Sequence, residues 1–314
     1  MAKVAVTGGT GLLGNALVPR LLARGHTLRL LTRPLGAGRS RPTIPGITWH
    51  EGSLADGASL DSFADGVDCI LHAAYSEPGA TTMPFATATQ TWFAENFTGT
   101  MRLLERTVAT GSKQLLYTSS LAVFSRDPDL DPRGDRFLRN EDAPLSPLEF
   151  YGSLRSACES LLRTAAHAYG LNTSIWRLGL VLGMREPWTA SPFAQQAREA
   201  THHGELRTPY GAYTVAVEDA AEILADAVGD LTTRGQTYHV FDRWITHADM
   251  APRLAAALGK QTRIACDAAK EPRLPILGAR IKERFSRWTT EEGLTALARN
   301  LVARVSHEPI ARPG

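Results

Sequence analysis

The stretch Thr7-Gly8-Gly9-Thr10-Gly11-Leu12-Leu13-Gly14 follows a short apolar run, Lys3–Thr7, and opens a segment with helical periodicity, 11–24. Its glycines Gly8, Gly11 and Gly14 recur at every third position. Glycine permits a tight turn, a close approach of the backbone to a pyrophosphate and close packing of helix on strand. The start of the helix then offers unpaired N–H groups to a phosphate. The stretch therefore predicts a dinucleotide-binding strand–turn–helix unit.

Short apolar runs alternate with longer amphipathic segments through the first half of the chain. This alternation is typical of parallel βαβ units, and it predicts an α/β fold with a doubly wound parallel sheet of the Rossmann type. Gly25, Gly111 and Gly170 each follow a predicted helix, where glycine commonly ends one. The predicted strands are 3–7, 28–32, 47–51, 69–73, 114–118 and 173–178, and the predicted helices are 11–24, 83–110 and 150–169.

The second half is less regular, with predicted helices at 219–231 and 280–304 and a strand at 237–241. We expect a dinucleotide-binding Rossmann domain over 1–183 and a smaller, mainly substrate-binding lobe over 184–314, with 211–242 returning to the sheet. The segment 126–147 is rich in Asp, Arg and Pro, and it is predicted to be a long surface loop.

Composition excludes several classes of protein. The 314 residues are 43% hydrophobic and 21% charged with a net charge of +2, which argues against binding to nucleic acid or to an anionic membrane. No apolar run approaches the roughly 18 residues of a membrane span, and nothing at the start is typical of a signal peptide. The three cysteines are scattered, so neither a disulfide framework nor a metal site is predicted. We expect a cytoplasmic protein.

Six further motifs follow the glycine stretch in chain order. Together with the TGxxGxxG spacing, they resemble the extended short-chain dehydrogenase/reductase superfamily, the NAD(P)-dependent epimerases, dehydratases and dihydroflavonol-type reductases. The resemblance covers about residues 3 to 242. The motifs are Ile70-Leu71-His72-Ala73-Ala74, Glu95-Asn96-Phe97-Thr98-Gly99-Thr100, Tyr117 through Phe124, Tyr151 through Glu159, Arg177 through Gly183, and Val217-Glu218-Asp219-Ala220-Ala221.

The resemblance implies a cofactor held by the glycine turn and by the ends of the strands. His72 is then expected in the wall of the cofactor site rather than in acid–base chemistry. Ser53 departs from the family's frequent Asp, which leaves Leu54 to pack on the adenine. The implied cofactor-binding residues are Gly8, Thr10, Gly11, Leu12, Leu13, Gly14, Ser53, Leu54, Ala73, Ala74, Tyr75, Asn96, Thr118, Leu178 and Val181.

The end of the second predicted strand indicates which cofactor is preferred. An acidic residue there would hold the ribose 2′-hydroxyl, whereas an arginine accepts a 2′-phosphate. The chain has Thr32-Arg33 and no acid at this point. We therefore predict NADP rather than NAD, with Arg33 as the phosphate ligand; the alternative is that Arg33 is a solvated loop residue.

The resemblance assigns catalysis to Tyr151 as acid or base. A phenol ordinarily has a pKa near 10, so this role needs a nearby cation that stabilises the phenolate. The family has a lysine four residues later, and this chain has Arg155, which is not equivalent to lysine in shape. Either Arg155 substitutes with changed geometry, or redox activity is lost. By the same resemblance Ser120 orients the substrate oxygen; alternatively it caps a loop.

These observations predict an NADP(H)-dependent oxidoreductase that acts on a carbonyl or alcohol of a small molecule. Trp188, Phe193 and Tyr210 make the region after Gly183 partly apolar, so a partly hydrophobic substrate is expected. One alternative is an NAD-dependent nucleotide-sugar epimerase or dehydratase, although Leu180 stands where those relatives have Asn. Another is a dinucleotide-binding sensor without turnover. The resemblance also implies a homodimer formed by helices 83–110 and 150–169.

Overall fold

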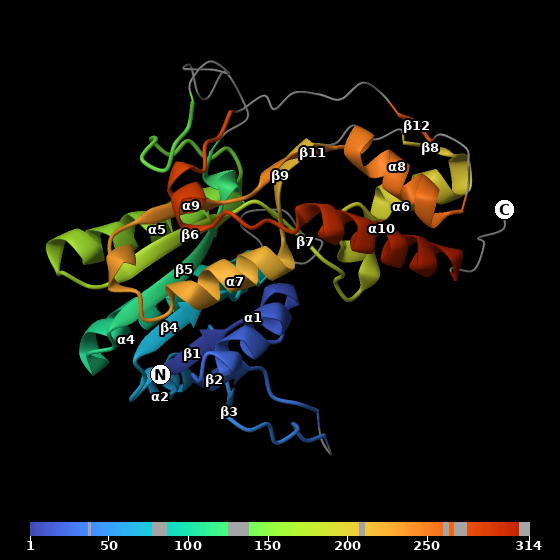
Figure 1. Cartoon of the computed structure of the whole chain (residues 1–314). Helices are drawn as coiled ribbons and strands as arrows, with labels where there is room; N and C mark the ends of the chain where they lie inside the picture. The colour runs from blue at the N-terminus through green and yellow to red at the C-terminus, as the bar shows by residue number, and fades with distance from the viewer. Residues whose placement is uncertain are drawn as a thin grey trace.

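The computed structural model describes residues 1–36, 39–76, 87–124, 138–206, 211–259, 264–266 and 275–307. At its centre lies a seven-stranded parallel sheet (Figure 1) with the order β10-β6-β5-β4-β1-β2-β3. The strand order reverses between β1 and β4, which is where open α/β sheets bind ligands. The strands are β1 Lys3–Thr7, β2 Thr27–Thr32, β3 Ile47–Glu51, β4 Cys69–His72, β5 Gln114–Ser120, β6 Thr173–Leu178 and β10 Thr237–Val240. The predicted fold class is confirmed.

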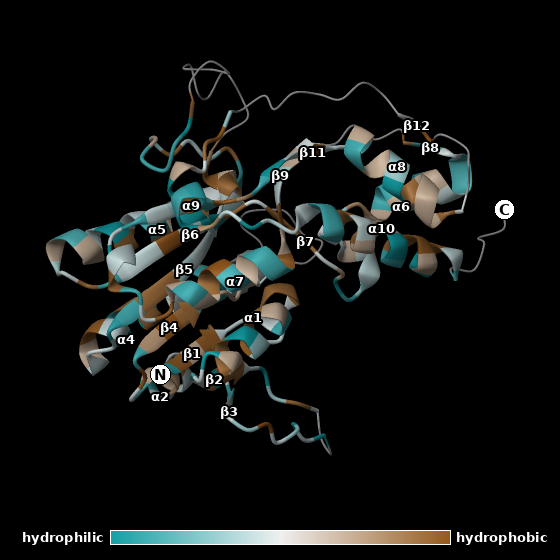
Figure 2. Ribbon diagram, viewed as in Figure 1, coloured by the Kyte–Doolittle hydropathy of each residue, from teal (hydrophilic) through white to brown (hydrophobic). Residues whose placement is uncertain are grey.

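Helices cover both faces of this sheet. On one face α1 (Leu12–Ala23), α7 (Val217–Ala227) and α9 (Ala279–Arg284) bury Leu17, Leu224 and Ile281 against the strands. On the other face α2 (Gly57–Ala64), α4 (Gly99–Thr110) and α5 (Phe150–Ala168) bury Leu60, Leu103 and Leu162. Figure 2 shows brown, apolar strands under helices whose outer faces carry teal, polar residues. Both layers therefore form by burial of an apolar helix face.

The predicted helix 83–110 is a continuous helical run in its described part, with a change of pitch in the middle. It consists of α3 (Thr87–Phe93), a π-helical turn (Ala94–Thr98) and α4, whereas its predicted start at 83–86 lies outside the described residues. A Cβ on Gly99 would lie 2.4 Å from the carbonyl oxygen of Leu54. The helix therefore packs on the chain after β3 more closely than a side chain at this position would allow. The widened turn lies beside this contact, which sets Asn96 against the end of β4.

A smaller lobe follows β6. Strands β7 (Leu180–Leu182), β9 (Gly211–Ala216) and β11 (Arg243–Thr246) form a three-stranded sheet that leads from the central sheet to the lobe (Figure 1). The lobe buries a separate apolar core that includes Phe193, Met250 and Leu301. Its remaining elements are α6 Ala194–His203, α8 His247–Ala257, α10 Thr290–Ser306, β8 Glu205–Leu206 and β12 Ala265–Cys266, and short 3-10 turns lie at Leu121–Val123, Trp188–Ala190 and Leu231–Thr233.

The prediction of one helix over 280–304 is wrong. The structure has α9 and α10 with a non-helical break at 285–289. Phe285 and Trp288 pack edge to face, with centroids 4.9 Å apart, onto the apolar core beneath α7. Thr289 donates from its N and its Oγ1 to the carboxylate of Asp219, at 2.8 Å each. These two anchors hold the non-helical segment in place, and helical periodicity alone does not reveal either of them.

The outer surface of α3 and α5 carries exposed apolar side chains. Phe93, Phe150 and Leu161 are 42%, 51% and 42% exposed. The homodimer that the resemblance implies stays a prediction. Among the helices that the structure describes, none combines the length and apolar character needed to cross a bilayer.

Candidate active site

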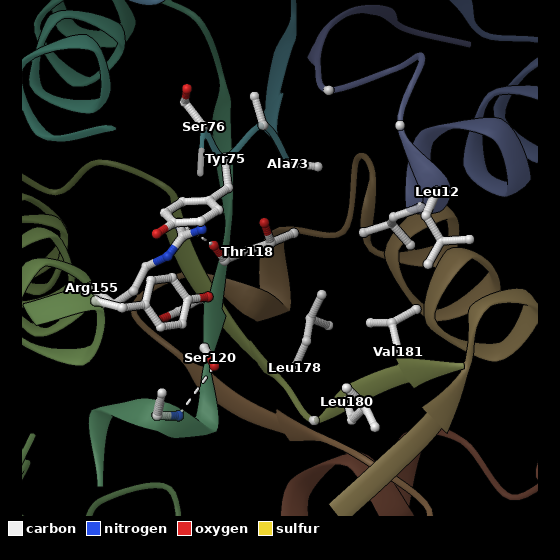
Figure 3. A pocket seen from close by; sticks show the side chains of 18 of the residues that line it. Leu12, Ala73, Tyr75, Ser76, Thr118, Ser120, Arg155, Leu178, Leu180 and Val181 are labelled. Atoms are coloured by element: carbon white, nitrogen blue, oxygen red, sulfur yellow. Dashed lines mark hydrogen bonds between the residues drawn. The ribbon is translucent and has the colours of Figure 1, made fainter. Parts of the chain in front are cut away.

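A pocket of about 1090 Å³ lies at the carboxyl edge of the central sheet, between that sheet and the smaller lobe. Figure 3 shows residues of the glycine turn, of several strand ends and of α5 around one space. Of the predicted catalytic and cofactor-binding residues, Gly14 and Asn96 do not line it, and neither does His72, which was predicted in the wall of the cofactor site. Those that line it are Gly8, Thr10, Gly11, Leu12, Leu13, Arg33, Ser53, Leu54, Ala73, Ala74, Tyr75, Thr118, Ser120, Tyr151, Arg155, Leu178 and Val181.

The three glycines of the turn have three different roles. Gly8 has φ +75°, and a Cβ there would lie 2.8 Å from the backbone of Ala73 and Ala74. A Cβ on Gly14 would lie 2.2 Å from the carbonyl oxygen of Gly8, so this residue brings helix and turn together rather than facing the pocket. Gly11 caps α1 with no side-chain hydrogen bond, and no acid lies in the first helical turn. The free N–H groups and the missing side chains fit a pyrophosphate.

Arg33 lies where β2 ends, and its exposed side chain lines the pocket. The wall at this strand end consists of Leu31, Thr32 and Arg33 and contains no carboxylate. Arg41 Nη2 donates to the carbonyl oxygen of Arg33 at 2.8 Å, while its guanidinium lies 5.1 Å from the centre of the Trp49 ring. Arg41 thus holds the backbone of Arg33 in place, and the guanidinium of Arg33 faces the pocket.

His72 organises the wall beside the glycine turn. Burial, with a smaller effect of Arg155, lowers the pKa of His72 to about 3, so the ring is neutral. Thr100 Oγ1 donates to the Asn96 carbonyl at 2.6 Å and therefore accepts from His72 Nε2 at 2.9 Å. Nδ1 then accepts from Thr7 Oγ1 at 2.6 Å, and Thr7 accepts from the N–H of Ala74 at 3.1 Å. This chain of bonds ties β1, β4 and the π turn together.

Asn96 supports the pocket from behind. Its side-chain amide accepts from the N–H of Ser76 and donates to the Ser76 carbonyl, both at 2.9 Å. Asn96 is 3% exposed. Its side chain therefore holds the segment that carries Tyr75 and Ser76, both of which line the pocket.

Arg155 is buried among aromatic rings. It is 4% exposed, and its Nη1 donates to Tyr117 Oη at 2.9 Å and to the Thr118 carbonyl at 3.1 Å. The guanidinium carbon lies 4.8, 5.4 and 5.3 Å from the ring centres of Tyr75, Tyr117 and Tyr151. Figure 3 shows the guanidinium of Arg155 beside Tyr75. Burial raises the pKa of Tyr117 above its usual range although Arg155 opposes that rise, so this phenol stays protonated. The cation is thus fixed beside Tyr151 by neutral partners.

The start of α5 carries Tyr151 and packs on the turn that follows Ser120. A Cβ on Gly152 would lie 2.1 Å from the carbonyl oxygen of Ala122, so the helix start is packed onto the turn after Ser120. Ser120 Oγ accepts from the N–H of Ala122 at 3.1 Å, which is the loop cap considered as an alternative (Figure 3). Its own proton remains available to a substrate oxygen, so capping and substrate binding are compatible.

A buried polar network behind the pocket was not predicted. Glu159 accepts from Ser119 Oγ at 2.6 Å and from Arg177 Nη2 at 2.8 Å. Arg177 Nη1 donates to His239 Nε2 at 2.9 Å, and His239 Nδ1 then donates to the Leu277 carbonyl at 2.7 Å. Burial and Arg177 lower the pKa of His239 to about 3. The network holds the segment after 274, and Ile276 of that segment lines the pocket.

The substrate side differs from the sequence expectation. Phe193 is buried in the core of the lobe and Trp188 packs against that core, so neither lines the pocket, and Tyr210 lies outside the described residues. Of the predicted loop 126–147, residues 126–137 also lie outside them. The residues found on this side are Leu121, Ala122, Phe124, Leu148, Glu149, Gly179, Leu180, Arg185, Ala190, Ser191, Pro192, Gly211, Ala212, Tyr213, Trp244 and Ile276. Apart from Leu180 they belong to no predicted site, because strands and segments far apart in the sequence, such as β9, β11 and the segment after 274, place them.

Comparison with known proteins agrees with this architecture. The model of the NAD dependent epimerase/dehydratase family matches residues 4–238. A UDP-glucose 4-epimerase of Azospirillum brasilense is 27% identical over 185 residues, which are 58% of this chain and 49% of the relative. A 3 beta-hydroxysteroid dehydrogenase/Delta 5-->4-isomerase of Mycobacterium tuberculosis is 35% identical over 124 residues, 39% of this chain and 33% of the relative.

The curated relatives are matched over only part of their length, between 33% and 52%. Solved structures extend the likeness in fold to nearly the whole chain. The UDP-glucose 4-epimerase of Thermus thermophilus in complex with NAD has a TM-score of 0.72 at 23% identity, and the match covers 95% of this chain and 98% of that one.

Proposed function

The chain belongs to the NAD-dependent epimerase/dehydratase family, and from this premise we propose that it is an NADP(H)-dependent oxidoreductase. Its substrate is a small, partly apolar molecule with a carbonyl or an alcohol group. The observation that carries the proposal is one pocket that contains the glycine turn, Arg33, Ser120, Tyr151 and Arg155.

The pocket has the features that a nicotinamide dinucleotide needs. The turn around Gly8 and Gly11 presents backbone N–H groups at the start of α1 to the pyrophosphate. Arg33 at the end of β2 meets the 2′-phosphate, where no carboxylate is present to bind a free ribose hydroxyl. The cofactor, when bound, supplies or accepts the hydride.

The protein's own residues handle the proton and the substrate oxygen. Tyr151 gives its phenolic proton to the substrate oxygen during reduction, and its phenolate accepts the alcohol proton during oxidation. Ser120 donates a hydrogen bond to the same oxygen. Arg155 holds a fixed positive charge beside Tyr151, with its guanidinium carbon 5.3 Å from the centre of that ring. Arg155 therefore keeps the charge that lysine supplies in the family, but from a buried position.

A second candidate is an NAD-dependent epimerase or dehydratase acting on a nucleotide sugar. The family match and the epimerases among the relatives favour it. Leu180 argues against it, because this apolar side chain lines the pocket where those relatives have Asn. Tightly bound NAD+ released on denaturation of the purified protein would favour this candidate.

Cofactor titration tests the proposal. We expect NADPH to bind about tenfold to a hundredfold more tightly than NADH, the usual range for hydrogen bonds to a charged group. Arg33→Ala should remove most of this preference, whereas Arg39→Ala, exposed and outside the pocket, should retain it. Loss of NADPH absorbance with a panel of carbonyl compounds then measures turnover. The proposal fails if neither cofactor binds, and the sensor alternative fails if NADPH is steadily oxidised.

A further inference from the structure

The indole ring of Trp244 lines the substrate side of the pocket, and other aromatic side chains pack against it. Trp244 of β11 pairs directly with Tyr213 of β9, and the two rings lie edge to face with centroids 5.1 Å apart. Tyr213 in turn packs on Phe241 at 4.6 Å, and its Oη accepts from the N–H of Ile276 at 2.9 Å. Tyr213, Trp244 and Ile276 all line the pocket. The indole is thus part of a rigid aromatic row that runs from the core to the pocket wall.

Gly211 makes room for this ring. A Cβ on Gly211 would lie 2.3 Å from Trp244 Cζ2 and 2.8 Å from Cε2, so the indole rests on the bare backbone of β9. The residue lies in an extended strand, where any side chain is sterically allowed by the backbone. The absence of a side chain is therefore required by the indole and not by the strand.

The charges on this side suit a neutral substrate. Among the described pocket-lining residues that follow Ser120 in the sequence, the ionisable groups besides Tyr151 and Arg155 are Glu149, Arg185 and Tyr213, and the carboxylate of Glu95 also lines the pocket. Arg155 is already bonded to Tyr117 and to the Thr118 carbonyl. A nucleoside diphosphate needs cations to balance its phosphates, but here Glu149 offsets Arg185. The other side chains are mostly apolar, which is typical of sites for uncharged ligands.

From these observations we propose that the pocket takes an uncharged substrate with a planar ring, which stacks on Trp244 while its carbonyl or hydroxyl oxygen reaches Tyr151 and Ser120. The inference rests on the proposed oxidoreductase function and names its substrate class. Aromatic rings stack favourably on indole, whereas a flexible chain of equal size gains less and loses more conformational freedom on binding.

Calorimetric titration of the NADP+-loaded protein tests the preference. The probes are β-tetralone (a bicyclic ketone with a planar benzene ring), methyl octyl ketone (a flexible ketone with as many carbons) and UDP-glucose. We expect β-tetralone to bind about fivefold to tenfold more tightly than methyl octyl ketone, the range that corresponds to aromatic pairing energies. UDP-glucose should bind more weakly than either. Equal affinity for the two ketones, no binding of β-tetralone, or tighter binding of UDP-glucose would overturn the inference.

Substitutions in the pocket test whether Trp244 causes the preference for β-tetralone over methyl octyl ketone. Trp244→Ala should weaken β-tetralone binding about tenfold with little change for methyl octyl ketone, and Trp244→Phe should retain most of the preference. Gly211→Ala should act like Trp244→Ala, because the new methyl group displaces the indole. Trp288→Ala is the matched control, since Trp288 packs on Phe285 outside the pocket.

The same titrations separate the two proposals. NADP+ affinity should stay within about twofold of wild type in every variant, since the substitutions leave the glycine turn and Arg33 unchanged. If NADP+ does not bind the wild-type protein, the proposed function fails. If NADP+ binds but Trp244→Ala and Gly211→Ala keep the wild-type preference for β-tetralone, the ring site alone is wrong.

Discussion

The two halves of the pocket are built on different principles. The cofactor half consists largely of backbone, because Gly8 and Gly14 bring turn, helix and β4 to distances that no side chain permits. The substrate half consists of side chains such as Trp244 and Ile276, which arrive from the three-stranded sheet and from the segment after 274.

This difference decides what each half can tolerate. A methyl group added to the cofactor half collides with main-chain atoms that cannot move away, so its shape depends on the fold itself. In the substrate half an exchange of Trp244 changes the ligand surface while the strand pairing of β11 with β9 stays. Recognition of the substrate can therefore vary on an unchanged cofactor site, as is general for folds that host many functions.

The largest expected effect lies where the two halves meet. Tyr151→Phe removes the phenolic proton but keeps the ring that packs at 4.8 Å on Tyr75. We expect kcat to fall about a hundredfold to ten-thousandfold, the usual contribution of general acid–base catalysis, with NADPH affinity unchanged. Steady-state kinetics and NADPH titration measure the two quantities. Tyr169→Phe, on the exposed residue that ends the same helix, is the control, and equal activity of both variants would remove Tyr151 from the mechanism.

The two halves of the pocket also differ in how much of each can be predicted from the sequence. The glycine turn, the strand ends and Arg33 could be placed from sequence because each lies within a few residues of a strand that periodicity identifies. Trp244 could not, since its position depends on β11 pairing with β9, and α7 and β10 separate these two strands in the chain. Gly211 is the one local sign of that contact, and a glycine in a strand has other common causes.

The sequence predicts that Arg155 belongs to the site, but it does not predict which groups its guanidinium contacts. The sequence places it four residues after Tyr151, whereas the structure sets its guanidinium against Tyr117 and Thr118. These partners lie on β5, and only the packing of α5 on that strand brings them together. Asn96 shows the reverse case, because the motif assigns it to the cofactor, whereas its side chain lies behind the pocket wall and bonds to Ser76.

A methyl group in the cofactor half should have the next largest effect. Gly8→Ala and Gly66→Ala impose the same kind of strain, since both glycines have positive φ, of +75° and +63°. Only at Gly8 would the new Cβ meet main chain, at 2.8 Å, because nothing lies within 4 Å of the Cβ position on Gly66. Gly8→Ala should therefore lower the free energy of unfolding by about 1–3 kcal/mol more than Gly66→Ala does, as overpacking commonly does.

Urea denaturation and NADPH titration measure this difference. Gly8→Ala should also weaken NADPH binding by tenfold or more, about 1.4 kcal/mol, because the turn and Ala73 must move apart. Gly66→Ala should bind NADPH like the wild type. Similar losses in the two variants would mean that the cofactor half owes its shape to backbone conformation and not to close contact.

The smallest expected effect concerns the junction between Arg155 and Tyr117. Arg155→Lys keeps the charge but loses the planar donor group that reaches Tyr117 Oη, and Tyr117→Phe removes the acceptor of the same bond. Because both substitutions break one interaction, the double variant should lose about 1 kcal/mol less free energy of unfolding than the sum of the single variants. Arg155→Lys combined with Tyr169→Phe should be additive, since Tyr169 is 76% exposed at the far end of α5. Additivity in both cycles would mean that Tyr117 does not hold the cation, and Arg155 would then depend on the Thr118 carbonyl and the rings of Tyr75 and Tyr151 for its position beside the substrate half.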